Sequence, residues 1–205
     1  MQLRLATQDT GSEYVAREGW REARLLECPL HRGRRCGLAR HGTYTRKTPP
    51  GTQITRYYCR KGHTTFSLLP DCLSARLPGE LREVEEAVRT VERASSLEAA
   101  TEETRLDIEL PGALRWLRRR ARPVHTALLA LVTLLPGRLG HTPRLHALGE
   151  RLKTEQVLVR LRHIAARHLR TLPKPLGLRP PLGPGGLPGG RPGGPPTEDG
   201  ADGAG

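Results

Sequence analysis

The feature that most constrains the fold of this chain is a pair of cysteine and histidine clusters about thirty residues apart. The first is Cys28-Pro-Leu-His31, and the second is Cys59-Arg-Lys-Gly-His63. A tetrahedral zinc ion in a structural site needs two close ligand pairs that the fold brings together. Because the segment between the clusters has few apolar residues, metal binding worth about 10–16 kcal/mol would stabilise a fold that a small core cannot.

We therefore expect a Zn²⁺ ion held by Cys28, His31, Cys59 and His63. Two alternatives stay open at this point. The site could use Cys36, since Cys28 and Cys36 bracket an arginine-rich loop. The segment could also be a degenerate ribbon without metal.

A β-hairpin is expected between the two clusters. Pro49-Pro50-Gly51 predicts a tight turn, and short β-type runs flank it at residues 43–45 and 53–58. Cys72 lies beyond the hairpin in an apolar context, so it is expected to be a small core residue. His41 is expected on the surface of the hairpin rather than at the metal.

Together these segments resemble the N-terminal zinc ribbon of bacterial insertion-sequence transposases and related uncharacterised proteins. The resemblance is carried over residues 25–78 by Cys28-Pro29, His41 to Arg46, Arg56 to Cys59, and Thr65 to Asp71. In that family both ligand pairs are commonly Cys-x2-Cys, and a helix-turn-helix follows the ribbon. The likeness therefore implies DNA binding by about residues 25–122.

The chain departs from the family pattern at both knuckles. His31 stands where the first pair has its second cysteine. At the second knuckle Gly62 takes the usual cysteine position, and His63 lies one residue later. A Cys2His2 set is still tetrahedral.

The helical part begins after Pro78-Gly79. A first helix is expected where Leu81, Val84 and Val88 share one face, with the glutamates of this stretch mostly off that face. Ser95 with Glu98 predicts the start of a second helix.

Pro111 predicts the opening of a third helix, which carries five arginines and no acid up to Arg122. Two helices ahead of a basic third helix are typical of a helix-turn-helix, whose last helix enters the major groove. Trp116 on this helix is expected to be a core or boundary anchor.

The charge distribution favours a polyanionic partner. The chain has 34 basic and 21 acidic residues, a net charge of +13. Codon usage alone would spread arginine evenly, yet an acidic block at residues 80–110 separates two basic blocks. Arginine suits phosphate because its guanidinium binds in a fork and releases counterions. The expected DNA contacts are Arg34, Arg35, Arg46, Arg56 and Arg60 in the ribbon, and Arg115, Arg118, Arg119, Arg120 and Arg122 in the third helix.

The expected fold class is α+β: a small zinc-ribbon hairpin domain, a helix-turn-helix-like helical domain and a disordered tail. An apolar helix is expected at residues 124–135, and a long amphipathic helix at 143–172 with Arg160, Arg162 and Arg167 outward. The expected divisions are an N-terminal arm (1–24), the ribbon (25–78), the helix-turn-helix-like segment (79–122), a helical extension (123–172) and a Pro/Gly-rich tail (173–205).

The sequence favours a non-enzymatic protein. The carboxylates expected of a transposase catalytic core are missing after Leu110, where the few acids accompany no strand pattern. No phosphate loop or nucleophile elbow occurs. The Glu-rich residues 80–110 fit solvated helix faces.

The longest apolar run, Ala127 to Leu135, is too short for a membrane span, and the N-terminus lacks the pattern of a secretion signal. A cytoplasmic protein, nucleoid-associated when bound to DNA, is therefore expected. The function expected from all this is DNA binding by a transposase-derived or mobile-element-associated protein. The alternatives are a module that binds a protein partner such as a recombinase, or a second copy of itself, and a decayed transposase remnant.

Overall fold

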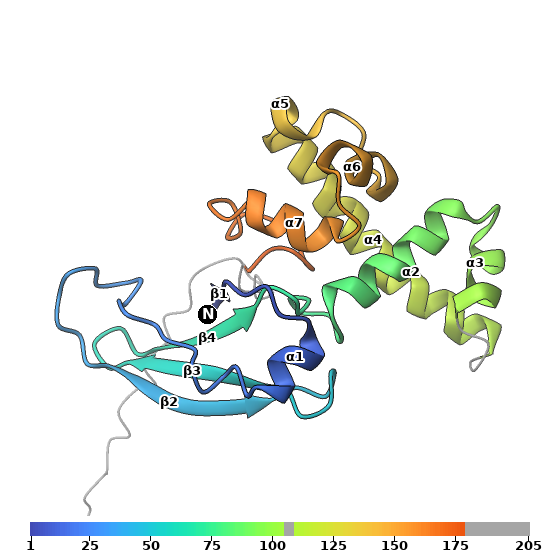
Figure 1. Cartoon of the computed structure of the whole chain (residues 1–205). Coiled ribbons are helices and arrows are strands. Elements are labelled where there is room, and N and C mark those ends of the chain that lie inside the picture. Colours follow the sequence, from blue (N-terminus) through green and yellow to red (C-terminus); the bar gives the residue numbers. More distant parts are fainter. Residues whose placement is uncertain (105–108, 179–205) are drawn as a thin grey trace, which may run out of the picture.

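The computed structural model describes residues 1–104 and 109–178 and has a mixed α+β architecture. Its elements are β1 (Gln2–Leu5), α1 (Gly11–Ala16), β2 (Leu38–Thr45), β3 (Gln53–Cys59), β4 (Thr64–Pro70), α2 (Leu81–Arg93), α3 (Leu97–Thr104), α4 (Leu110–Leu134), α5 (Pro136–Leu139), α6 (Leu145–Leu152) and α7 (Val157–Ile164). Figure 1 shows the sheet at one end of the molecule and the helices α2 to α6 at the other, with α7 next to the sheet.

The sheet has four strands in the order β1-β4-β3-β2. Strands β2 and β3 form the expected antiparallel hairpin around the turn at residues 49–51. Strand β4 pairs with the other edge of β3 and is also antiparallel to it. The N-terminal arm is not separate from the ribbon, because β1 pairs in parallel with β4. A bulge interrupts the β2–β3 register between Arg40 and Thr43.

One apolar core joins the sheet to the helices. Ile54 and Leu69, from one face of the sheet, belong to the same buried cluster as Val84 of α2, Leu128 of α4 and Leu158 of α7. A second, smaller cluster lies on the opposite face and contains Tyr57, Phe66 and Leu68 together with three cysteines. The ribbon and the helical part therefore share a core over residues that the sequence assigned to separate domains.

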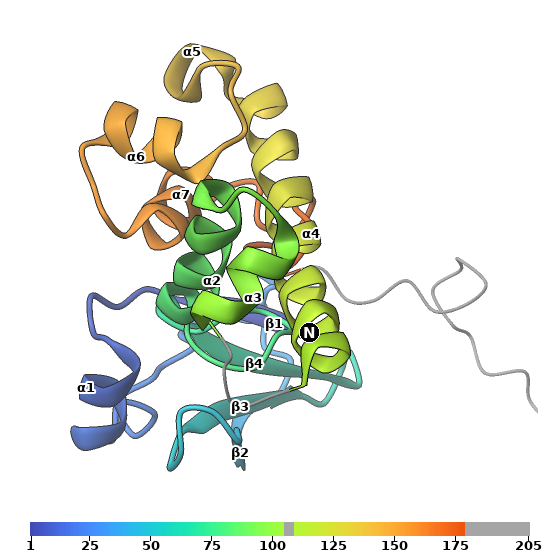
Figure 2. The same cartoon turned by 90° about the vertical axis from the view of Figure 1, so that its right-hand side faces the viewer.

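The helix α2 forms as expected, with Leu81, Val84 and Val88 buried. The next helix starts one residue later than expected, because the hydroxyl of Ser96, not Ser95, accepts a hydrogen bond from the amide of Ala99. Helices α2, α3 and α4 then pack around Ala87, Ala100 and Leu117 (Figure 2).

Two helix predictions are wrong in length. The third helix and the apolar helix at 124–135 are one helix, α4, which continues through Pro123. The long amphipathic helix expected at 143–172 is instead two short helices, because α6 ends at Lys153 in the left-handed conformation with φ 50°. The sequence Lys153-Thr154-Glu155 interrupts the apolar period at that point.

The disordered tail was expected to begin at Pro173, but residues 173–178 belong to the folded structure. Leu176 and Leu178 are buried in the main core. The carbonyl of Pro175 accepts hydrogen bonds from the amide of Ala75 and from Arg162. The rest of the expected tail, residues 179–205, lies outside the described residues.

Candidate metal centre

Four potential metal ligands gather where the loop before β2 meets the turn after β3. They are Cys28, His31, Cys36 and Cys59. A turn places His31 next to Cys28, since the amide of His31 donates to the carbonyl of Cys28 at 3.1 Å. Backbone hydrogen bonds hold the two loops together, because the amide of Lys61 donates to the carbonyl of Cys36 at 3.1 Å.

The donor atoms have the spacing of a tetrahedral site. All four lie within 4.8 Å of one another. Nδ1 of His31 lies 3.5 Å from Sγ of Cys28 and 3.4 Å from Sγ of Cys59. Zinc–sulfur and zinc–nitrogen bonds of ordinary length at a tetrahedral angle separate the two donors by about 3.5 Å. The cluster can therefore hold a metal ion without rearrangement of these three side chains.

The structure brings Cys36, not His63, together with Cys28, His31 and Cys59, which is the grouping of the alternative that included Cys36. Nδ1 of His63 lies 3.4 Å from the hydroxyl of Tyr58, and His63 is exposed. The knuckle explains the difference. A Cβ placed on Gly62 would lie 3.4 Å from Sγ of Cys59 and 3.2 Å from His31, so position 62 faces the cluster while position 63 turns away.

The signal for Cys36 was present in the sequence. Cys36 directly precedes Gly37, which adopts φ 66°, and the first strand of the hairpin begins at Leu38. The left-handed conformation of Gly37 turns the chain from Cys36 into that strand, so Cys36 ends the loop that begins at Cys28. His63 was favoured because each knuckle was expected to supply two ligands, one pair from residues 28–31 and the other from residues 59–63. In the structure the loop before β2 supplies three of the four clustered residues, and Cys59 is the fourth.

The thiols differ in how readily they ionise. Burial opposes ionisation of Cys28, but hydrogen bonding from His31 and from the backbone of Leu30 outweighs it and lowers the pKa of Cys28 to about 7. Burial, with the neighbouring thiols of Cys28 and Cys59, raises the pKa of Cys36 to about 11. A bound cation would favour the thiolate form of each ligand.

The remaining cysteine and the remaining nearby histidine stand apart from the cluster, as expected. Cys72 is 6% exposed in the main core, and burial raises the pKa of its thiol to about 12. His41 is exposed, and its ring lies 5.7 Å from that of Tyr58.

The arginines expected to contact DNA from the ribbon have different roles. Arg34, Arg35 and Arg60 are exposed around the cysteine cluster. Arg46 is not available, because its guanidinium donates to the carbonyls of Ser74 and Leu77 at 3.1 and 2.8 Å. It joins the hairpin to the turn before α2. Arg56 is half-buried, and its Nε is enclosed without a hydrogen-bond partner.

Most of the arginines expected to contact DNA from the third helix are exposed, unlike Arg46 and Arg56. The core side of α4 is formed by Ala113, Leu117 and Ala121. The opposite, exposed side carries Arg115, Arg118, Arg119 and Arg122 over two turns. Arg120 lies elsewhere on the helix, with its guanidinium 3.8 Å from the centre of the Trp116 ring. Trp116 is half-buried against Ala87 and Ala100, which agrees with the expected anchor.

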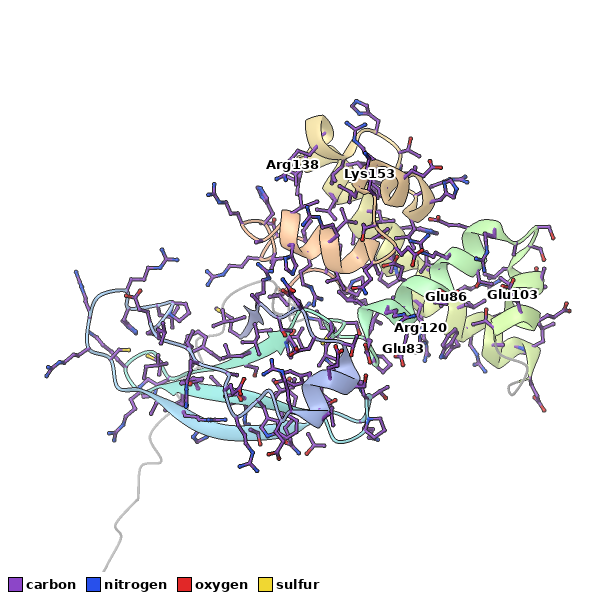
Figure 3. All side chains as sticks on the ribbon, viewed as in Figure 1. Glu83, Glu86, Glu103, Arg120, Arg138 and Lys153 are labelled. Atoms are coloured by element: carbon purple, nitrogen blue, oxygen red, sulfur yellow. The ribbon has the colours of Figure 1, made fainter. Side chains whose placement is uncertain are left out.

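Acidic residues lie beside this basic helix as well as on the solvated faces expected of them. Glu98, Glu102 and Glu103 are exposed on α3, and Arg93 of α2 pairs with Glu103 at 3.0 Å. Figure 3 shows Glu86 and Glu103 on the α2–α3 side of the molecule, and Arg138 and Lys153 at the α5–α6 end.

Two glutamates of α2 have structural roles that the sequence did not predict. Glu85 is 3% exposed and accepts hydrogen bonds from the amides of Val157 and Leu158, the first residues of α7. Glu92 accepts from the amides of Leu145 and His146, the first residues of α6. Each carboxylate satisfies helix amides that would otherwise lack partners.

Arg162 was expected to point outward and is instead almost completely buried. Its guanidinium donates to the carbonyls of Asp71, Leu73 and Pro175 at 2.7–2.9 Å. Burial lowers its pKa to about 10. Arg162 thus fastens α7 to the segment after β4.

No family model matches this chain, and no curated protein or solved structure matches it either. Among the described helices, none is long and apolar enough to cross a membrane. The cysteine cluster and the basic surface of α4 are therefore the features of this chain that bear on its function.

Proposed function

We propose that this protein is a non-enzymatic DNA-binding protein with a structural zinc ion at Cys28, His31, Cys36 and Cys59. Zinc suits this set because three thiolates and one imidazole are its preferred structural ligands. Cys28, Cys36 and Cys59 are buried and the set offers four protein donors, which favours a closed structural site over a catalytic site with an open position.

The DNA-binding part of the proposal rests on one observation. Arg115, Arg118, Arg119 and Arg122 project from the exposed side of the first half of α4, opposite its buried side. Along the next turns the same side carries Thr126, Leu129 and Thr133, so the positive charge is confined to one end of the helix. Such a stripe matches the phosphates and base edges of a groove into which a helix is inserted.

The three-helix packing supports the same proposal. Helices α2 and α3 are joined by three residues and pack on α4, as two supporting helices pack on a recognition helix. The exposed Arg34, Arg35 and Arg60 would supply additional contacts to phosphate from the ribbon end. The resemblance of residues 25–122 to transposase N-terminal regions adds the proposal that DNA of a mobile element is the target.

A double substitution tests the role of α4. Replacing Arg118 and Arg122 by Ala removes two charges from the exposed stripe without opening the core. We expect duplex DNA binding, measured by fluorescence anisotropy, to weaken at least about tenfold at low salt. The slope of log K against log salt should fall by about 2, because two phosphate contacts are lost.

The matched control is the replacement of Arg160 and Arg167 by Ala, since these exposed arginines lie on α7 and just after it. This control should leave the salt slope close to that of the wild type. Equal losses in both variants would show that binding depends on net charge alone. Unchanged binding in the α4 variant would remove α4 from the interface.

A second candidate function is docking of a partner protein, favoured by two exposed leucines on α4. Leu129 and Leu134 are 56% and 45% exposed. Apolar docking would persist as salt is raised, whereas DNA binding would fall steeply. Salt dependence of the bound fraction therefore separates the two candidates.

A further inference from the structure

A groove runs along α4 and shares Arg115 and Arg119 with the exposed arginine stripe. It has a volume of about 530 Å³. One wall is formed by Leu77 and Pro78, which belong to the turn before α2. The other wall is α4 itself, which contributes Gly112, Arg115, Trp116, Arg119 and Arg120.

The chemistry of the groove is cationic and aromatic. Of the seven described residues that line it, three are arginines and none carries a carboxylate. The guanidinium of Arg115 is only partly engaged, through Nε to the carbonyl of Pro111 at 3.3 Å. Guanidinium groups bind phosphate in a fork, so an anion in this groove would meet Arg115 and Arg119 directly.

The aromatic part of the groove is a stacked pair. Arg120 lies over the Trp116 ring at 3.8 Å. Planar aromatic rings and guanidinium planes are the groups on which proteins stack unpaired bases. A base inside a duplex has no free face for such a pair, but an unpaired base does.

We propose that this groove binds one unpaired nucleotide of a nucleic acid strand, with its phosphate at Arg115 and Arg119 and its base against the Trp116–Arg120 pair. This inference rests on the proposed function and adds a ligand class to it. The stripe at Arg118 and Arg122 would contact the backbone of the duplex, while the groove would take a nucleotide from a strand end or an opened base pair.

Trp116 makes the proposal measurable in the full-length chain. The protein has two tryptophans. Replacing Trp20 by Phe leaves Trp116 as the single tryptophan, and Trp20 packs against Tyr14 and is not among the described residues that line the groove. We expect a short oligothymidylate to quench Trp116 fluorescence in this background with a saturable titration. An unchanged circular dichroism spectrum would establish that the Trp20→Phe protein is folded.

The decisive comparison uses two pairs of exposed arginines. Arg115→Ala with Arg119→Ala removes the groove charges and should weaken the quenching titration by about tenfold or more. Arg160→Ala with Arg167→Ala removes the same charge on α7 and just after it, and should change the titration less than about threefold. Equal weakening in both pairs would overturn the assignment to the groove.

Three further outcomes separate the sources of the signal. No quenching by oligothymidylate, with duplex binding intact, would overturn the groove proposal and leave the proposed function standing. Equal quenching by inorganic phosphate or by polyglutamate would show a general anion site and would also overturn it. Both proposals would be supported by two results together. The variant with Arg118→Ala and Arg122→Ala would lose duplex binding, and the variant with Arg115→Ala and Arg119→Ala would lose the quenching of Trp116 by oligothymidylate.

Discussion

The cysteine end and the helical end of this molecule are each stabilised by different interactions. At the cysteine end, three of the seven fully buried apolar side chains are the cysteines of the cluster. At the helical end, a continuous core runs from Ile54 through α2, α4, α6 and α7 to Leu178. Burial of a large aliphatic side chain contributes about 1.5–3 kcal/mol, so the helical end has many such contributions and the cysteine end has few. The comparison teaches that a metal ion held by the four clustered residues would add stability where the apolar core is smallest.

The ends also differ in how they use charge. Exposed arginines surround the cysteine cluster without any acid among the ligands, whereas the helical end places the carboxylates of Glu85 and Glu92 on the first amides of α7 and α6. Charge at the cysteine end is thus available to a partner. At the helical end the carboxylates of Glu85 and Glu92 fix one helix to another, while the arginines on the exposed side of α4 stay open to solvent.

Metal removal should have the largest effect on folding, and it should affect the cysteine end alone. We expect one zinc per chain by elemental analysis, and its removal by a chelator should unfold residues 25–38 and 59–63. The contribution lost is about 10–16 kcal/mol for a structural zinc site at neutral pH. Hydrogen exchange should then rise in those two segments and stay slow in residues 124–132 of α4.

A pair of variants makes the metal prediction specific. Cys36→Ser should lose the zinc, while His63→Ala should keep it, because His63 contacts Tyr58 instead of the cluster. The opposite result would restore His63 as a ligand. Slow exchange that persists in both knuckle segments after chelation would show that the small core suffices.

The sequence predicted the features that depend on local pattern. The hairpin, α2, the buried position of Cys72 and the half-buried position of Trp116 follow from turn residues and apolar periodicity over a few residues. Three of the four clustered ligands, Cys28, His31 and Cys59, follow from knuckle spacing. These features need no knowledge of distant contacts.

What the sequence did not predict depends on partners far along the chain. Arg46 and Arg162 look like surface arginines, but each finds backbone carbonyls presented by the segment after β4. Glu85 looks solvated on its own helix and becomes buried only because α7 begins next to it. Charged residues with such roles are recognised from tertiary structure, since periodicity describes one element at a time.

The next largest effect should come from Glu85 and should appear at the helical end alone. Glu85→Ala leaves the amides of Val157 and Leu158 without their acceptor and Arg89 without its partner at 2.8 Å. Buried groups left unsatisfied cost about 1–3 kcal/mol each, so we expect the free energy of unfolding to fall by about 3 kcal/mol. Urea unfolding followed by circular dichroism measures this loss.

The neighbouring residue supplies the control for Glu85. Glu86 is exposed on the same helix, so Glu86→Ala should change the free energy of unfolding by less than about 0.5 kcal/mol. Zinc content should be normal in both variants. A similar loss in both would mean that helix propensity, rather than the α7 amides, accounts for the effect.

The smallest effect is a pH dependence at Glu92, which sharpens the comparison because it acts at the α2–α6 contact of the helical end. Burial opposes ionisation of this carboxylate, but hydrogen bonds from His125 and from the amides of Leu145 and His146 outweigh it, so the pKa of Glu92 is lowered from 4.5. A carboxyl group whose pKa is lower in the folded state contributes stability above its unfolded pKa. That contribution is lost as the pH falls through the folded pKa.

Glu92→Gln removes the titrating group and keeps one acceptor oxygen, whereas the carboxylate uses Oε1 for the amide of Leu145 and Oε2 for that of His146. We expect the variant to be less stable than the wild type at pH 6, with the difference shrinking as the pH falls below 4.5. Urea unfolding of both proteins across this range gives the two curves. Parallel curves would show that the carboxylate gains nothing from the folded state, and the amides of α6 would then be satisfied equally well by a neutral acceptor.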